Sequence, residues 1–144
     1  MKISTRYRYA LHALMEMAHR WGRGYAKRKQ MAEKRNISDS YLENILVDLK
    51  AHGIVRSERG SNGGYALTRD PASISLLDVM NALEGSMAPV DCVENESACM
   101  KSADCVLRGV YRELKEAQEA VLGRISLQTL LERSRGSLNF SFSI

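Results

Sequence analysis

The chain has 144 residues, enough for one ordinary domain with a hydrophobic core and too few for a large two-domain enzyme. Its composition, 44% hydrophobic and 26% charged with only 2 Pro, excludes a disordered tail and a fibre. The formal net charge of +4 is unevenly divided, because residues 1–70 hold 14 Lys and Arg against 7 Asp and Glu, whereas residues 71–144 hold 7 against 10. A basic half favours a polyanionic partner, with a merely solvated basic face as the alternative.

The first predicted helix begins after a capping residue at Ser4 or Thr5 and ends at the glycines Gly22 and Gly24. Its apolar face repeats at spacings of four and three and consists of Tyr7, Leu11, Leu14, Ala18 and Trp21. This periodicity predicts a helix that packs against the core along one side.

Two further helices are predicted before residue 54. The second is short, runs from Lys27 to Arg35 and ends at Asn36, a residue type that tolerates the left-handed conformation. Ser38 is placed to cap the third helix, and Gly53 closes it. The apolar face of this third helix consists of Leu42, Ile45, Leu46 and Leu49.

A β-hairpin is predicted next. Two short alternating runs, at residues 54–58 and 65–68, flank a Gly-rich segment at residues 59–64, where glycine supplies the positive φ angles of a hairpin loop. Helix, short helix, helix and hairpin in this order predict a winged helix-turn-helix over residues 1–70. In such a unit the third helix enters the major groove of DNA, and the hairpin touches the flanking backbone or the minor groove.

Residues 71–133 are predicted to form a second region. Ser75 and Asp78 form a capping-box start for a fourth helix that ends at Gly85. Residues 86–105 show no periodicity and form an acidic loop. A long amphipathic helix starts at Val106, and its apolar face consists of Val110, Leu114, Ala117, Val121 and Ile125.

This long helix is predicted to serve dimerisation. A helix of about 20 residues is about 30 Å long, more than a small winged-helix unit can cover, so a partner chain is expected on its apolar face. Packing onto the first helix of the same chain is the alternative. Ser126 is placed to cap one more short turn through Leu131, and the tail at residues 134–144 is expected to be mobile or strand-like.

Residues at three places are candidates for contact with double-stranded DNA. Exposed N–H groups and hydroxyls at the start of the third helix can meet phosphates or base edges, whereas plain capping is the alternative for Ser38. Arg59 is placed to enter a minor groove, and cations that open the second helix oppose its dipole, so a nearby phosphate would explain them. Solvated charges are the alternative at both places. The candidates are Lys27 and Arg28, with Lys29 beside them, then Ser38, Asp39, Ser40 and Tyr41, and in the hairpin Arg59, Ser61 and Asn62.

The acidic loop contains all three cysteines, Cys92, Cys99 and Cys105, with the spacing C-x6-C-x5-C. Three thiols without a nearby histidine do not suit a structural zinc site, which takes four ligands, usually in close pairs. A thiolate-rich loop suits an iron–sulfur cluster, and three ordinary thiols are the alternative. We expect a cytoplasmic chain without a membrane partner, because the opening segment lacks the apolar core of a signal peptide and no apolar run approaches the roughly 18 residues of a membrane span.

The chain resembles the IscR, NsrR and CymR family of bacterial winged-helix transcription regulators over residues 1–133. The segments that carry the resemblance are MKISTRYRYALHAL, ISDSYLENIL, GIVRSERGSNGGYALTRD, ISLLDVMNALEG and CVENESACMKSADC. The resemblance implies a homodimer with paired long helices. It also implies, for many members, a [2Fe-2S] or [4Fe-4S] cluster that tunes DNA binding.

The fourth cluster ligand departs from the family pattern. Members use either a histidine three residues after the last cysteine, where this chain has Arg108, or an acidic residue early in the first helix, where it has Arg8. A guanidinium stays protonated and offers iron no lone pair. The other candidates are Asp91, Glu94, Glu96 and Asp104 of the loop, a histidine of the partner chain, water or a small thiol. An exchangeable fourth site favours a sensing role.

The predicted function is therefore that of a homodimeric transcriptional repressor. Its operator binding would be controlled by an iron–sulfur cluster that senses redox state, nitric oxide or iron–sulfur status. A cluster-free regulator that responds to thiol oxidation or to a partner protein is the alternative. We do not expect an enzyme, because the sequence has no phosphate loop, no H-E-x-x-H motif and no evident nucleophile–base pair. A thiol protein that binds RNA or an acidic protein is a third possibility.

Overall fold

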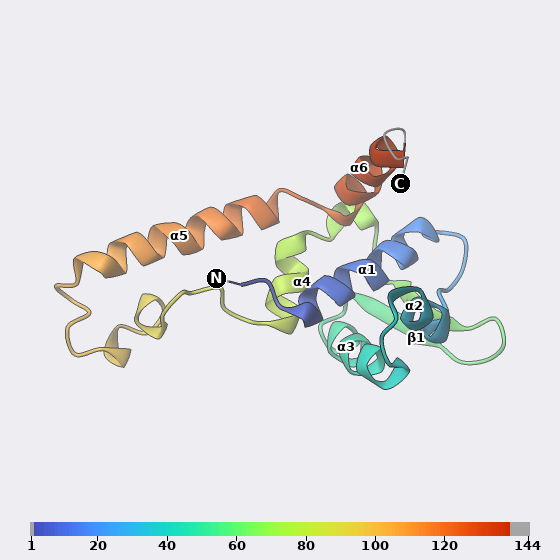
Figure 1. The fold of residues 1–144 in the computed structure, drawn as a ribbon, viewed down its shortest axis with the longest axis horizontal. Helices are drawn as coiled ribbons and strands as arrows, with labels where there is room; N and C mark the ends of the chain where they lie inside the picture. Colours follow the sequence, from blue (N-terminus) through green and yellow to red (C-terminus); the bar gives the residue numbers. More distant parts are fainter. Residues whose placement is uncertain (1, 139–144) are drawn as a thin grey trace.

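The structure, a computed structural model, describes residues 2–138 as a helical head from which one long arm extends (Figure 1). The head contains the two-stranded antiparallel hairpin, and the arm consists of the fifth helix with the cysteine loop at its far end. Single 3-10 turns lie at residues 71–73, 91–93 and 96–98. The helices and strands are α1 (Thr5–His19), α2 (Arg28–Arg35), α3 (Asp39–Ala51), β1 (Val55–Glu58), β2 (Gly64–Leu67), α4 (Leu76–Leu83), α5 (Val106–Gly123) and α6 (Leu127–Leu138). The predicted fold class, mainly helical with a hairpin wing, is confirmed.

Local capping fixes where the helices of the head begin and end. The Ser4 hydroxyl accepts a hydrogen bond from the Tyr7 N–H at 3.0 Å, and Ser38 caps α3 in the same way. Ser75 and Asp78 form both halves of a capping box at the start of α4. Asn36 ends α2 with a φ of 52°, in the left-handed region. These features agree with the sequence prediction.

The core of the head lies where α1, α3, α4 and α6 meet the hairpin. Its fully buried side chains include Leu14, Ile45, Leu46 and Val79. Leu127 of α6 is also fully buried, and α6 packs against α1. The C-terminal helix is thus part of the head, and one hydrophobic cluster holds the head together.

Tyr7 links α1 to the start of α4. Its side chain is 2% exposed, and its hydroxyl donates a hydrogen bond to the Leu76 carbonyl at 2.8 Å. Burial raises the pKa of Tyr7 to about 12, because the phenolate would lose its hydration inside the core. The phenol is therefore held neutral while it bonds the α4 backbone.

We expect Tyr7→Phe to lower the free energy of unfolding by about 1–3 kcal/mol, because the Leu76 carbonyl then loses its partner inside the core. Urea denaturation at pH 7 measures this loss. Because the pKa of Tyr7 is higher in the folded than in the unfolded chain, the wild type should also lose stability as the pH rises from about 10 to about 12. That part of the alkaline loss should be missing in the variant.

The hairpin wing is anchored to the segment that leads into α2. Strands β1 and β2 pair in the register Val55↔Leu67 to Glu58↔Gly64, with Val55 and Leu67 buried. Ala26 and Tyr65 form an additional antiparallel bridge through two backbone hydrogen bonds of 2.8 and 2.9 Å. Gly64 has a φ of 147°, and a Cβ there would lie 2.5 Å from the Ala26 carbonyl oxygen. Only glycine therefore allows this close approach of the two segments.

Two sequence predictions about the head are wrong. Trp21 lies beyond the end of α1 and is 42% exposed, so it does not belong to the buried face of that helix. The segment after Ser126 forms a helix of 12 residues rather than a short turn, and residues 134–138, predicted to be mobile or strand-like, are helical. Residues 139–144 of the predicted tail lie outside the described residues.

The arm leaves most of its surface uncovered. None of the 18 residues of α5 is buried, although its apolar face is the one predicted from the sequence up to Val121. Val110 is 48% exposed and Val121 is 42% exposed. The helix meets α4 near its C-terminal end, where Gly123 lies beside Leu77. Within residues 2–138, no helix has the length and hydropathy needed to cross a membrane.

Candidate nucleic-acid interface

The start of α3 presents three exposed polar residues, Ser38, Asp39 and Ser40. The Ser38 hydroxyl accepts from the Tyr41 N–H at 3.1 Å, so it performs the capping role that was one of its two predicted functions. The Tyr41 ring is half-buried and packs edge-on against Tyr9 at 6.1 Å between centroids. The polar groups that this end offers to a ligand are thus the hydroxyl of Ser40, which lies 3.4 Å from that of Ser38, the hydroxyl of Tyr41 and the backbone N–H groups of the first turn.

Arg28 of α2 is bonded to α3. Its Nε and one terminal nitrogen donate to the two carboxylate oxygens of Asp39 at 2.8 and 2.7 Å, and its other terminal nitrogen lies 2.6 Å from a carboxylate oxygen of Glu43. These hydrogen bonds lower the pKa of Asp39 and raise that of Arg28. The structure therefore places two predicted DNA-binding residues, Arg28 and Asp39, in contact with each other.

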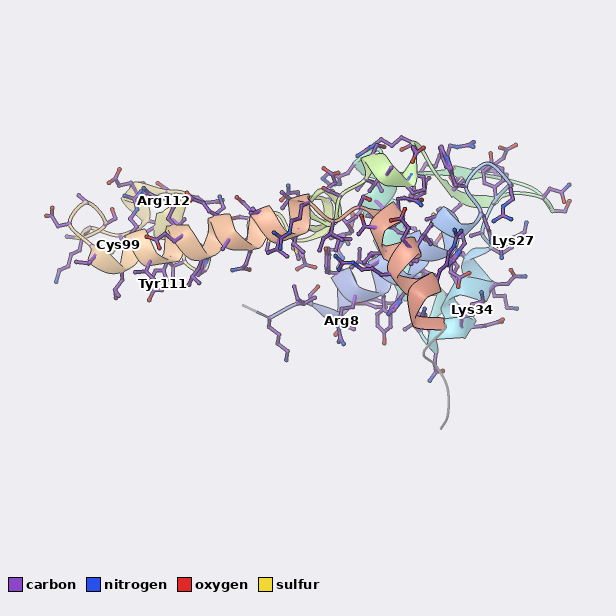
Figure 2. All side chains as sticks on the ribbon, turned by 90° about the horizontal axis from the view of Figure 1, so that it is seen from above. Arg8, Lys27, Lys34, Cys99, Tyr111 and Arg112 are labelled. Carbon is purple, nitrogen blue, oxygen red and sulfur yellow. The ribbon has the colours of Figure 1, made fainter. Side chains whose placement is uncertain are left out.

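Lys27 is bonded to the wing. Its ammonium donates to the backbone carbonyl oxygens of Ser61 and Gly63 in the loop between the strands. Figure 2 shows Lys27 at the end of the head where the hairpin loop projects. Both cations at the start of α2 are thus held by groups of the protein itself.

The tip of the wing presents the exposed residues Arg59, Ser61 and Asn62. Within residues 2–138, the Arg59 guanidinium makes no hydrogen bond or ion pair, whereas Arg56 of β1, three residues earlier, bonds the Tyr25 hydroxyl. Gly60 follows with a φ of 107°, which allows the sharp turn at the tip. Arg59 is therefore an unpartnered cation at the most projecting part of the head.

A cluster at the base of the wing was not predicted from the sequence. The Tyr25 hydroxyl donates to a Glu58 carboxylate oxygen at 2.5 Å and accepts from Arg56 at 2.6 Å, and the Arg56 guanidinium lies 5.1 Å from the centre of the Tyr25 ring. The hydrogen bond to Glu58 raises the pKa of Tyr25. The alternation of Arg56 and Glu58 along β1 places both on one face, but no sequence signal identifies Tyr25 as their partner.

The cysteine loop lies at the opposite end of the molecule from the wing (Figure 2). Cys92 and Cys105 are half-buried, Cys99 is exposed, and none of them forms a disulfide. No three Cys, His, Asp or Glu side chains between residues 2 and 138 lie close enough together to hold a metal ion. The three thiols suit iron chemically, but one chain in this conformation does not bring them together, so a bound cluster would require the loop to rearrange around it.

Arg108, at the position where the family places a histidine ligand, is part of the loop structure. Its Nε donates to the Cys92 carbonyl at 2.7 Å, and a terminal nitrogen donates to Glu96 at 3.0 Å. Lys115 forms an ion pair with Glu94 at 2.9 Å. The pKa of Glu94 is lowered mainly by a hydrogen bond from Ser86 and next by the contact with Lys115. Arg8 contacts Thr5, within its own helix. The structure therefore uses both arginines and two of the candidate acidic ligands in contacts of their own.

The model of the Rrf2 family, described as iron-dependent transcriptional regulator, matches residues 3–133. The chain is similar to the HTH-type transcriptional regulator CymR of Bacillus subtilis, with 34% identity over 136 residues that cover 94% of each chain. It is also similar to the HTH-type transcriptional regulator IscR of Xenorhabdus nematophila, with 32% identity over 92% of this chain and 80% of the relative.

Solved structures agree with the fold. The structure of CymR, the global cysteine regulator of B. subtilis, matches with a TM-score of 0.72 and 32% identity over 92% of this chain and 98% of that one. IscR of T. potens matches with a TM-score of 0.75 and 31% identity over 93% of this chain and 88% of that one.

Proposed function

The chain belongs to the Rrf2 family of transcriptional regulators, and on this premise we propose that it is a homodimeric repressor whose operator binding is controlled through its cysteine loop. Membership of this regulator family agrees with the prediction that the chain is not an enzyme. The observation that carries the DNA-reading part is the unpartnered Arg59 at the wing tip, with the exposed start of α3 in the same head. A regulator that binds the chromosome of a bacterium works in the cytoplasm, and we place the chain there.

Direct contacts with DNA are proposed for two elements. The start of α3 enters the major groove, with Ser40 and the backbone N–H groups facing phosphates or base edges. Arg59 enters the adjacent minor groove, flanked by Ser61 and Asn62. The roles of Lys27, Arg28 and Asp39 are treated separately below, because their side chains contact other parts of the protein.

The proposed dimer forms through α5. Its apolar face forms an open groove with the start of the chain, lined by Ile3, Met87, Leu114, Ala117, Val121 and Leu122. A second copy supplies the same apolar face, and the symmetric contact would cover both. Two heads on one dimer would then meet half-sites roughly 34 Å apart, one turn of DNA, or a multiple of this distance.

For the control of operator binding we propose the three cysteines of the loop. The iron–sulfur form predicted from the sequence is supported by the description of the matching family model as iron-dependent and by the chemistry of three thiols within 14 residues. Thiol oxidation is supported by a different observation, the exposure of Cys99 and the separate positions of the three thiols.

We expect an anaerobically prepared chain to contain iron and sulfide, and Cys92→Ser, Cys99→Ser and Cys105→Ser each to remove most of both. Absorption spectroscopy with iron and sulfide assays measures this. Ser97→Ala, in the same loop, is the matched control and should keep the iron. A colourless wild type without iron, in which a mild oxidant changes operator affinity and Cys99→Ser abolishes the change, would instead establish the thiol form.

The DNA-reading function is tested by selection of duplexes from a random-sequence pool with the full chain, followed by footprinting. We expect a selected sequence with two inverted half-sites, protected as one unit. Recovery of unrelated sequences that bind with equal affinity would contradict a sequence-specific regulator. Selection of RNA over duplex DNA would support the RNA-binding alternative instead.

A further inference from the structure

We propose that Lys27 and Arg28 are positioning residues that hold the wing and the recognition helix at a fixed spacing, instead of binding DNA phosphates themselves. This inference rests on the proposed function, since it concerns how the two DNA-reading elements are arranged. Both residues lie at the start of α2, between the wing and α3. The side chains of the N-cap residue Lys27 and of the first helical residue Arg28 thus reach the two elements that read DNA.

Lys27 fixes the loop of the wing. An ammonium group has three N–H donors and no acceptor. The Lys27 ammonium donates two hydrogen bonds, one to the carbonyl oxygen of Ser61 and one to that of Gly63. Ser61 and Gly63 belong to the tip that carries Arg59, and Gly63 is buried there. The backbone bridge between Ala26 and Tyr65 holds the other end of the same hairpin. The position of the tip therefore depends on the segment at residues 26–27.

Arg28 fixes the start of α3. Its planar guanidinium forms a two-bond fork with Asp39, the first residue of the recognition helix, and reaches Glu43 one turn later. Each of the three guanidinium nitrogens therefore contacts a carboxylate oxygen of Asp39 or Glu43. A phosphate would have to displace a carboxylate that is already charged and in contact, so binding it would gain little energy.

The arrangement also accounts for two cations at a helix start, where they oppose the helix dipole. Lys27 and Arg28 are compensated by carbonyl oxygens and carboxylates from other elements, so no external anion is required. Lys27 and Arg28 are therefore expected to affect DNA affinity by holding the wing and α3 in position, and not by contacting phosphates. A phosphate contact and a positioning contact differ in their salt dependence, because only the first releases counterions when DNA binds.

The test uses the full chain and the selected duplex in fluorescence-anisotropy titrations at several salt concentrations. Arg28→Lys keeps the charge but cannot form the fork. We expect it to weaken binding about as much as Arg28→Ala, by roughly tenfold, with no change in the slope of log K against log salt. A phosphate contact predicts the opposite: near-normal binding for Arg28→Lys, and a slope reduced by about 0.9 for Arg28→Ala.

Asp39→Ala distinguishes the two roles by the direction in which DNA affinity changes. Removal of a negative charge beside DNA should tighten binding if electrostatic attraction alone matters, whereas loss of the Arg28 partner should weaken it if positioning matters. We expect weaker binding, and no further loss when Arg28→Ala is added to Asp39→Ala. Tighter binding of Asp39→Ala would overturn the proposal for Arg28.

Lys27 is tested through Arg59. If Lys27 acts by placing the wing tip, Lys27→Ala should weaken binding about fivefold in the wild type and less than twofold in the Arg59→Ala background. Lys29→Ala, which removes the same charge from an exposed neighbour, should show the same effect in both backgrounds. Equal losses for Lys27→Ala in both backgrounds, with a reduced salt slope, would overturn the proposal for Lys27.

Two further measurements separate this proposal from the proposed function and from misfolding. A wild type that selects no specific duplex would overturn the proposed function and, with it, the positioning proposal, whereas a selected duplex with the salt slopes of a phosphate contact would overturn the positioning proposal alone. Stoichiometric titration at high protein concentration gives the active fraction of each variant, and circular dichroism gives its helix content. Affinity losses that disappear after correction for the active fraction would show that the variants are only partly folded and would count against positioning.

Discussion

Leu114→Glu should convert the dimer into a monomer and weaken binding to a two-half-site operator by about 10²–10⁴-fold. The half-buried Leu114 lies midway along α5 in the apolar groove, where a second copy is proposed to pack. A carboxylate on each chain at this contact would be desolvated without a partner. The operator loss has a separate cause, because a linked pair of heads gains an avidity of that order over a single head.

The head should survive this substitution, since no residue of α5 is buried in the single chain. Analytical ultracentrifugation gives the oligomeric state, and anisotropy titrations compare the full operator with one half-site. Arg112→Glu is the matched control, because Arg112 is exposed (Figure 2) and a spacing of two residues places it on the side of α5 opposite to Leu114, and it should leave the dimer intact. A dimer that persists in Leu114→Glu would show that another surface joins the two chains.

The same residue separates two explanations for the exposed helix. If α5 folds back in solution onto α1 of its own chain, Leu114→Glu lowers the stability of the head but leaves the mass of the particle unchanged. If α5 pairs with its copy, the particle formed by Leu114→Glu has half the mass of the wild-type dimer. The thermal midpoint of the variant then no longer depends on protein concentration, because no subunits dissociate when it unfolds.

Much of the fold was predictable because the signals are local. Ser4, Ser38 and Ser75 cap helices through residues three positions away, and Asn36 ends a helix through its own backbone conformation. α6 was missed for the opposite reason. Its Ser- and Gly-containing second half has low helix propensity, but Leu127 and Leu131 are buried against the head and hold the helix there.

The candidate site was predictable in position but not in its internal contacts. Sequence spacing places Lys27 at the start of a helix and Arg59 beside a glycine-rich turn, and the structure agrees with both. The partners of Lys27 lie 34 and 36 residues away in the chain, and those of Arg28 lie 11 and 15 residues away. No periodicity encodes such pairings, because they depend on how the hairpin and α3 pack around α2. For the same reason, the spacing of the cysteines does not predict how close their sulfur atoms lie.

Arg59→Ala should weaken binding to the selected operator by about 10–100-fold, the 1–3 kcal/mol expected for one well-placed arginine. The guanidinium has no partner within residues 2–138, so its removal leaves no other group of the described chain without a hydrogen bond. The loss in affinity therefore measures contact with DNA. Arg133→Ala, which removes the same charge from α6, is the control and should change affinity by less than twofold. Equal losses for the two variants would contradict the role of the wing.

The sequence of the flanking DNA gives a second, sharper readout for Arg59. Narrow minor grooves in A·T tracts have an enhanced negative potential that attracts arginine, whereas G·C flanks have a wider groove. The wild type should therefore prefer operators with A·T flanks, and Arg59→Ala should lose most of this preference while it keeps the discrimination that α3 makes in the major groove. A variant that loses affinity equally for both flanks would place Arg59 on the phosphate backbone, because backbone contacts carry no sequence information.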